Sequence, residues 1–126
     1  EANASSVTCW GTGSPLREFL HVDDLGKACV FALEHWFPTP VELTYMNVGT
    51  GVDLSIYDLA NEVAIATGYQ GEIIWDSKKP DGTPKKQLDV SRLAALGWRA
   101  DIKLKEGLAH TVAKFREDLS NQLVRT

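Results

Sequence analysis

Two short segments of the chain combine glycine or proline with cationic side chains, a pattern typical of sites for phosphorylated ligands. The first is Trp10–Arg17, with the sequence WGTGSPLR. Its glycines allow close approach to the backbone, and the Arg17 guanidinium can bind a phosphate through two parallel hydrogen bonds. Trp10 offers a flat face on which a base or a sugar could lie. The same residues also fit a hairpin turn with a core tryptophan and a surface arginine.

The second segment is Lys78–Lys86, with the sequence KKPDGTPKK. Its prolines stiffen the loop, and Asp81-Gly82 favours a turn between two pairs of lysines. A partly preorganised basic loop is a plausible clamp for an anionic ligand, because less entropy is lost on binding. A solvated surface loop is the alternative interpretation of the same charge run.

A third candidate for an anion site is the loop Gly49-Thr50-Gly51, which precedes an expected helix. An ordinary strand-to-helix turn explains it equally well. His21 lies in an extended apolar stretch, and we expect it to be packed and hydrogen-bonded rather than catalytic. The sequence contains no Gly-x-Ser-x-Gly, Walker A, His-Glu-x-x-His or Gly-x-Gly-x-x-Gly motif, and no Tyr-x-x-x-Lys pair. The chain therefore shows no catalytic group of its own.

The elements that would position these segments alternate between strand and helix. Val7–Trp10 is β-prone, and residues 17–22 are expected to be extended. A helix follows with Asp23 as its N-cap, and Pro38 and Pro40 end it. Its apolar residues form one stripe: Leu25, Ala28, Ala32, Leu33 and Trp36.

The second half of the chain continues the alternation. Residues 43–48 and 72–76 are predicted strands, and Ser55 caps a helix that Gly68 closes. A short helix begins at Asp89 or Ser91, and the last helix begins near Leu104. The last helix has its own apolar stripe: Leu104, Leu108, Val112, Phe115 and Leu119. The pattern predicts a small mixed α/β domain with few strands, and hence apolar surface that faces a missing partner.

Composition narrows the class of protein. The 126 residues fit one domain, and the net charge of -4 argues against nucleic-acid binding. Cys9 and Cys29 lack metal-ligand spacing and are expected to be buried thiols in a reducing compartment. There is no membrane-length apolar run and no signal peptide, so we expect no membrane partner and a cytoplasmic location. Residues 1–4 read like the tail of a helix, so we expect the chain to begin inside a longer protein.

Three motifs carry a family resemblance. The segment WGTGSPLREFLHVDD resembles the W-G-x-G-x-x-x-R-[ED]-F-x-H-V-D-D motif of extended short-chain dehydrogenase/reductases that act on sugar nucleotides. Asn47–Gly51 matches the later N-x-G-x-G of the same group. The block KPDGTPKKQLD is narrower and resembles the GDP-L-fucose synthase family. The resemblance extends from about Val7 to about Leu119.

The resemblance implies that the whole chain, residues 1–126, is the C-terminal substrate-binding lobe of a two-domain enzyme whose Rossmann domain is missing here. In that family the N-terminal Rossmann domain binds NADP(H) and carries the catalytic residues, and the parent is a homodimer. The parent reaction converts GDP-4-keto-6-deoxymannose to GDP-L-fucose by epimerisation and reduction. The isolated chain would then be inactive, with a GDP-sugar and the Rossmann domain as its partners.

The resemblance also assigns roles residue by residue. Trp10 and Arg17 correspond to GDP-sugar contacts, with Arg17 on the diphosphate. Lys86 corresponds to a basic contact from the second segment, and Asp81 is a nearby candidate. Two alternatives stay open: the same lobe of another nucleotide-sugar epimerase or dehydratase, and a non-catalytic nucleotide-sugar-binding module.

Overall fold

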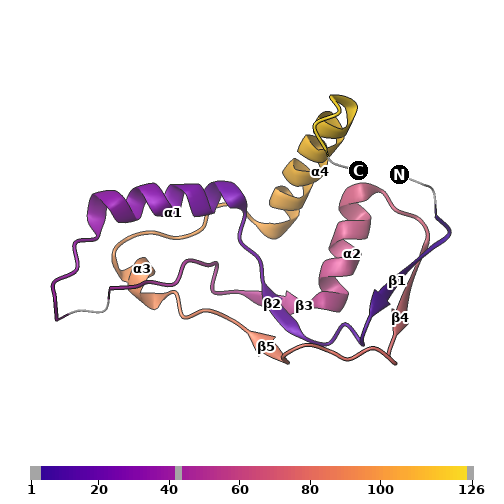
Figure 1. Ribbon diagram of the computed structural model, residues 1–126, viewed down its shortest axis with the longest axis horizontal. Coiled ribbons are helices and arrows are strands. Elements are labelled where there is room, and N and C mark those ends of the chain that lie inside the picture. Colours follow the sequence, from indigo (N-terminus) through magenta and orange to yellow (C-terminus); the bar gives the residue numbers. More distant parts are fainter. Residues whose placement is uncertain (1–3, 42–43, 125–126) are drawn as a thin grey trace.

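The computed structural model describes residues 4–41 and 44–124. In chain order the elements are β1 (Ser6–Trp10), β2 (Leu16–Glu18), α1 (Val22–His35), β3 (Asp53–Ser55), α2 (Ile56–Thr67), β4 (Glu72–Asp76), β5 (Lys85–Lys86), α3 (Ser91–Ala95) and α4 (Leu104–Ser120). They form an elongated α/β arrangement with α1 toward one end and the strands β1 and β4 at the other, beyond α2 (Figure 1). The mixed α/β class predicted from the sequence is confirmed.

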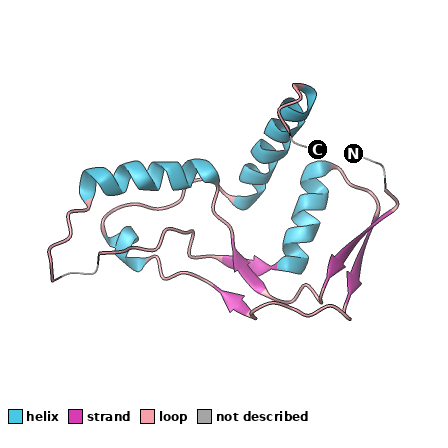
Figure 2. Ribbon diagram, in the orientation of Figure 1, coloured by secondary structure: helices cyan, strands magenta, loops and turns pink. Residues whose placement is uncertain are grey.

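The strands form two separate small sheets, visible as the magenta arrows of Figure 2. β1 pairs with β4 in parallel, from Ser6 opposite Glu72 to Trp10 opposite Asp76. The other sheet has the order β3-β2-β5, with β2 antiparallel to β3 and parallel to β5. Helix α2 follows β3 directly and packs against α4. Tyr57 of α2 also stacks on Trp75 of β4, so α2 links the two sheets.

The only fully buried carboxylate among the described residues, Asp24, ties α1 to the segment before α4. Its side chain is 1% exposed. Its Oδ2 accepts hydrogen bonds from the amides of Asp101 (3.0 Å) and Ile102 (2.8 Å), and Lys27 lies 3.4 Å from Oδ1. Burial raises the pKa of Asp24, but the amides of Ile102 and Asp101 and the Lys27 ammonium lower it more. The buried core packs beside this tie and consists of Ala28, Leu93 and Trp98.

Helix caps agree with the sequence at some ends and differ at another. Ser55 accepts a hydrogen bond from the Asp58 amide at 2.9 Å, and Gly68 adopts a left-handed backbone with φ of 74°, as predicted. The prediction that Asp23 caps α1 is wrong. The cap is His21, whose Nδ1 accepts from the Asp23 amide at 3.2 Å. The helix begins at Val22 because the imidazole nitrogen of His21 satisfies the amide of Asp23, one of the free amides of the first turn.

The strand predicted at residues 43–48 is not formed. Leu43 lies outside the described residues, and 44–48 have no regular secondary structure. A strand needs a neighbour for its backbone groups, and here only side chains approach: Arg92 donates to the Tyr45 carbonyl, and Asn47 donates to the Asp89 carbonyl. Two strands that the sequence did not predict, β3 and β5, are formed instead, because β2 lies between them and pairs with both.

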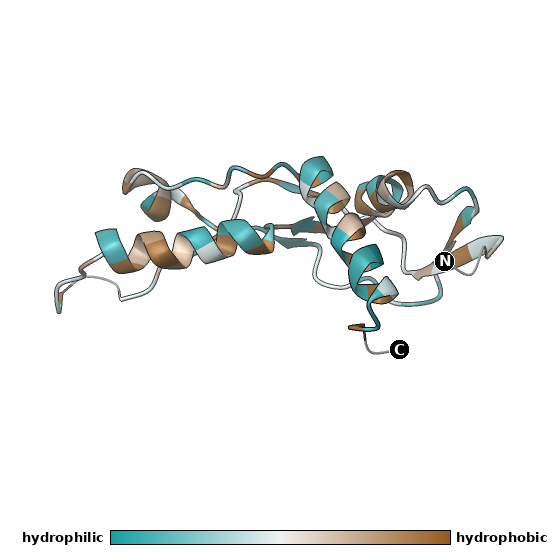
Figure 3. Cartoon of the chain, turned by 90° about the horizontal axis from the view of Figure 1, so that it is seen from above, coloured by the Kyte–Doolittle hydropathy of each residue, from teal (hydrophilic) through white to brown (hydrophobic). Residues whose placement is uncertain are grey.

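The molecule leaves much apolar surface open. Its accessible surface is 9152 Å², whereas a compact monomer of this mass exposes about 6,700 Å². The predicted stripe of α1 is only partly covered: Ala28 is buried, but Leu33 is 80% exposed. Seen from above, brown hydrophobic segments run along α1 (Figure 3). This agrees with the expected apolar surface. None of the described helices is long and apolar enough to cross a membrane.

The Asp24 tie yields a stability prediction. Asp24→Ala removes the acceptor of two backbone amides, and each unsatisfied amide costs about 1–3 kcal/mol. We expect the free energy of unfolding, measured with urea, to fall by about 3 kcal/mol. Asp23→Ala removes the neighbouring carboxylate, which is 69% exposed, and is the matched control. It should cost less than about 0.5 kcal/mol. Equal losses in both variants would contradict the tie.

Candidate functional site

Strand pairing brings two of the predicted site residues together. In the parallel pair of β2 and β5, Arg17 lies opposite Lys86. Paired positions on neighbouring strands project to the same face, about 5 Å apart. Two residues that are 69 positions apart in the sequence thus place their cationic side chains side by side.

The loop between β4 and β5 holds the Arg17 guanidinium. Arg17 Nη1 donates to the carbonyls of Leu16 and Thr83, both at 2.7 Å. Gly82 is packed so closely that an added Cβ would lie 3.0 Å from Arg17 Nη2. Nε and Nη2 make no hydrogen bond within the part of the chain that the structure describes. Two strong donors are therefore oriented and ready for a ligand oxygen.

Lys86 lies on the rim of an open groove of about 710 Å³. Its ammonium makes no ion pair with the described residues. The groove is lined by Arg17, Glu18, Leu20, Val48, Gly49, Lys85, Lys86, Gln87 and Leu88. Its lining combines the cationic side chains of Arg17, Lys85 and Lys86 with the aliphatic carbon of Leu20, Val48 and Leu88, which fits a ligand with an anionic part and a carbon-rich part.

The other face of the sheet is internally neutralised. Lys85 projects to that face, opposite to Lys86, and its ammonium lies 3.1 Å from Asp53 Oδ2. This oxygen is buried and has no hydrogen-bond partner among the described residues, so the ion pair alone compensates it. Asp53 lies opposite Glu18 in the β2–β3 pair. The alternation along β5 therefore separates a paired lysine from an unpaired one.

Asp81 is occupied by the protein itself. Its Oδ1 accepts from the Thr12 amide at 2.8 Å and its Oδ2 from the Thr12 hydroxyl at 2.7 Å. These hydrogen bonds lower the pKa of Asp81, and slight burial opposes them. The carboxylate also rests against Gly11, whose φ of 81° and missing Cβ make the contact possible. Asp81 thereby fastens the second basic segment to the first, with Gly82 against Arg17. The turn predicted at Asp81-Gly82 is not formed, because the chain turns earlier, at Ser77 and Lys78.

Trp10 lies apart from the arginine–lysine pair, on the two-stranded sheet. Its side chain is 73% exposed, so the alternative of a core tryptophan is wrong. The Lys79 ammonium lies over its ring, 5.2 Å from the centroid. A broad indole face thus stays open to solvent beside a second cation.

The glycine-rich loop before α2 does bind an anion, but the anion is a side chain of this protein. Glu18 Oε1 accepts from the Gly51 amide at 2.7 Å and from the Thr50 hydroxyl at 3.3 Å. A Cβ on Gly49 would collide with the same carboxylate oxygen. The predicted anion site at Gly49-Thr50-Gly51 is therefore filled.

Glu18 reaches a third segment through its other oxygen. Oε2 accepts from the Leu88 amide at 2.9 Å. Burial raises the pKa of Glu18, but hydrogen bonds from Leu88, Gly51 and Thr50 lower it more, so the net shift is downward. The sequence analysis missed this residue. Its only signal was the alternation that places a carboxylate next to Arg17 on β2.

The remaining predicted groups have structural surroundings. His21 is hydrogen-bonded at the start of α1 and meets His110 edge-on with centroids 6.1 Å apart, as a packed histidine should. The prediction of two buried thiols is wrong: Cys29 is exposed and Cys9 is half-buried. Their positions on an open helix and a short edge strand leave them uncovered. Among the described residues, no group of three or more metal-ligand side chains could hold a metal ion.

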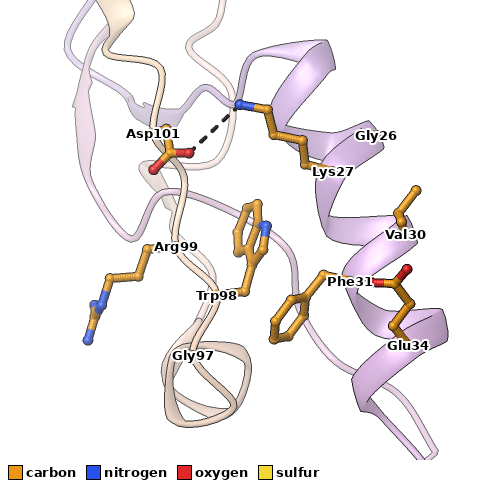
Figure 4. A pocket seen from close by; sticks show the side chains of 9 residues that line it. All are labelled: Gly26, Lys27, Val30, Phe31, Glu34, Gly97, Trp98, Arg99 and Asp101. Carbon is orange, nitrogen blue, oxygen red and sulfur yellow. Dashed lines mark ion pairs between the residues drawn. The ribbon is translucent and has the colours of Figure 1, made fainter.

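A second hollow, of about 590 Å³, lies between α1 and the segment that follows α3 (Figure 4). Trp98 and Phe31 project into the space between the two segments, and Lys27 approaches Asp101 at 3.7 Å. None of the four predicted site residues lines this hollow. It belongs to the packing of α1 and not to the arginine–lysine groove.

Comparison with known proteins shows what the chain is similar to. Residues 1–49 match the model of the NAD dependent epimerase/dehydratase family. The chain is 49% identical over 121 residues to the GDP-L-fucose synthase of Escherichia coli K12 and 47% identical over 118 residues to the probable GDP-L-fucose synthase 1 of Oryza sativa. These matches cover 92% and 94% of the chain.

The chain is a homologue of the GDP-L-fucose synthases. It spans only about a third of their length, 38% of the Escherichia coli protein and 35% of the rice protein. The family resemblance read from the sequence is thereby confirmed.

Solved structures share the fold. A GDP-6-OMe-4-keto-L-xylo-heptose reductase from C. jejuni superposes with a TM-score of 0.80 at 31% identity, over 91% of this chain and 34% of that one. The UDP-glucose 4-epimerase of Thermotoga maritima, solved with UDP-glucose, gives a TM-score of 0.76 at 30% identity, over 90% of this chain and 36% of that one. The fold is therefore that of part of an extended short-chain dehydrogenase/reductase.

The lowered pKa of Glu18 predicts a pH dependence. A carboxyl whose folded pKa lies below its ordinary value of 4.5 stabilises the fold above about that pH. This contribution is lost as the pH falls through the folded pKa. The Gly51 and Leu88 amide resonances should therefore titrate with a midpoint below 4.5, and Glu18→Gln should abolish the transition. A midpoint at or above 4.5 would exclude hydrogen bonding as the dominant influence.

Proposed function

We propose that this chain is the GDP-sugar-binding lobe of an NADP-dependent epimerase/reductase that converts GDP-4-keto-6-deoxymannose to GDP-L-fucose. The cofactor and the catalytic groups lie on a Rossmann domain outside this chain. The observation that carries the proposal is the pairing of Arg17 with Lys86, in a chain whose relatives are GDP-L-fucose synthases. The family resemblance also implies a cytoplasmic homodimer, which stays a prediction.

The cationic pair suits a diphosphate. Each Arg17 or Lys86 hydrogen bond to a phosphate oxygen contributes about 1.5–3 kcal/mol, because donor and acceptor are both charged. Two adjacent cations on one face can each take a different phosphate of a pyrophosphate. In this proposal the sugar extends from that pair along the groove, and Trp10 offers a surface on which part of the ligand can stack.

Asp81 has a changed role in this proposal. Since both of its oxygens accept from Thr12, it acts on the ligand indirectly, by setting the position of the loop that holds Arg17. A carboxylate pointing at a diphosphate would also repel it. We therefore retain Trp10, Arg17 and Lys86 as ligand contacts and treat Asp81 as a support for Arg17.

The residues of this chain do not fit a dinucleotide cofactor. A dinucleotide site needs free backbone amides in a glycine-rich turn at the start of a helix. The glycine-rich turn present here, residues 49–51, gives its amide to Glu18. At the start of α2, the amides of Ile56 and Tyr57 donate to the carbonyls of Pro15 and Gly13. For this reason the proposal places NADP(H) on the Rossmann domain.

The open surface supports a second domain. The excess over a compact monomer is about 2,400 Å², about three times the 800 Å² that one partner buries in a standard interface. Much of the exposed apolar side chain belongs to α1 and the residues after it, such as Leu33, Phe37 and Val41. A Rossmann domain packed there would cover them.

The alternative within the class is another nucleotide-sugar epimerase. The Thermotoga UDP-glucose 4-epimerase has the same fold at 30% identity. The GDP-L-fucose synthases are more similar, at 45–49% identity for the relatives from rice, Arabidopsis thaliana and Escherichia coli K12. This difference favours a GDP-sugar.

The reaction itself is the direct test. The chain should be joined to its native N-terminal half and supplied with NADPH and GDP-4-keto-6-deoxymannose. We expect NADPH oxidation and formation of GDP-L-fucose, and no turnover by the chain alone. A full-length protein that ignores GDP-sugars but accepts a UDP- or dTDP-sugar would refute the proposal.

Arg17→Ala and Lys86→Ala test the ligand contacts in the same full-length protein. Each removes a charged donor, so the KM for the GDP-sugar should rise about 10- to 100-fold while the protein stays folded. Lys105→Ala is the matched control, because that lysine carries the same charge but pairs with Glu62 on α2, outside the groove. An unchanged KM in both site variants would remove the assignment.

A further inference from the structure

Glu18 joins three segments that are distant in the sequence. It lies on β2 and accepts hydrogen bonds from the loop at Thr50 and Gly51 and from Leu88, just beyond β5. Gln87 completes the connection by donating to the Gly51 carbonyl. The 49–51 loop and the segment after Lys86 are thereby held against the same carboxylate.

The surroundings of Glu18 are shaped for a carboxylate. Oε1 accepts from the Gly51 amide and the Thr50 hydroxyl, Oε2 accepts from the Leu88 amide, and a Cβ on Gly49 would displace Oε1. A glutamine has one acceptor oxygen and one amide donor at these two places. It would turn a donor toward either the Gly51 or the Leu88 amide and lose that hydrogen bond.

The strand that carries Lys86 depends on this tie. β5 has only two residues, so few backbone hydrogen bonds fix it to β2. The Leu16 amide donates to the Pro84 carbonyl on one side of Lys86, and Leu88 donates to Glu18 on the other. Between these two anchors, Lys86 is kept opposite Arg17.

We propose that Glu18 is a positioning residue, which holds β5 in register with β2 so that Lys86 and Arg17 face one diphosphate together. This inference rests on the proposed function. It means that a negatively charged residue strengthens the binding of an anion. Bare electrostatics predicts the opposite, because removing a carboxylate from beside two cations should strengthen their attraction for an anion.

Glu18→Gln separates the two effects in the full-length protein, with GDP as the probe in calorimetry. Positioning predicts that the Kd for GDP rises about tenfold although the local charge becomes more positive. The kcat with saturating GDP-sugar should stay within about twofold, because Glu18 touches no reacting atom. Glu18→Asp keeps the carboxylate and should recover most of the affinity.

Two further variants protect this test from a general loss of fold. Glu62→Gln removes the same charge from a residue outside the groove, which pairs with Lys105, and leaves every contact of β5 intact, so GDP affinity should not fall. Gly49→Ala changes no charge and displaces the Glu18 carboxylate by contact, so it should weaken GDP binding as Glu18→Gln does. Melting temperatures of all four variants show whether each is folded.

The outcomes distinguish a failure of the proposed function from a failure of the positioning role alone. Wild-type protein that binds no GDP overturns the proposed function and this inference with it. Wild-type protein that binds GDP, together with a folded Glu18→Gln variant that binds it equally or more tightly, overturns the positioning role alone. Weaker binding in Glu18→Gln and Gly49→Ala, with Glu62→Gln unaffected, supports it.

Discussion

The arrangement of the candidate site depends on the parallel pairing of β5, a strand of two residues, with β2. β5 meets β2 only at Lys85 and Lys86, yet this contact decides which lysine lies opposite Arg17 and which pairs with Asp53. Because successive residues of a strand project to opposite faces, a shift of one residue would exchange them. The cation next to Arg17 would then be the one that the protein neutralises. The hydrogen bonds around β5 are therefore as important to the site as the charges themselves.

Three carboxylates hold distant segments of the chain in position. Glu18, Asp81 and Asp24 each accept backbone amides from a segment far away in the sequence. Hydrogen bonds lower the pKa of all three, so each is ionised in the folded protein at neutral pH. A charged acceptor forms stronger hydrogen bonds than a neutral one and has a defined direction. A chain with so small a buried core can use such ties in place of extensive packing.

The helices and the two strands β1 and β4 could be predicted from the sequence, because capping and periodicity are local properties. The caps Ser55 and Gly68 and the apolar stripe of α4 were predicted without reference to the rest of the molecule. The strands β3 and β5 were not predicted, and the strand predicted at residues 43–48 was wrong. A strand forms only when it pairs with another strand, and a single segment does not show which partner it will have. His21 took the capping position expected for Asp23, two residues further on, although local preferences favour aspartate as an N-cap.

The candidate site was partly predictable for the same reason. Arg17 and Lys86 were recognisable from residue type and motif, but their adjacency depends on a pairing that the sequence does not display. Asp81 was found as a residue near the site, whereas its contact with Thr12 emerged only from the fold. Glu18 was missed because its role lies entirely in backbone amides of other segments.

A structure of the full-length protein with GDP bound tests the central claim most directly. The account predicts phosphate oxygens within about 3.2 Å of both the Arg17 guanidinium and the Lys86 ammonium, with β5 still in register on β2. Diphosphate bound elsewhere, with these two side chains directed into solvent, would contradict it.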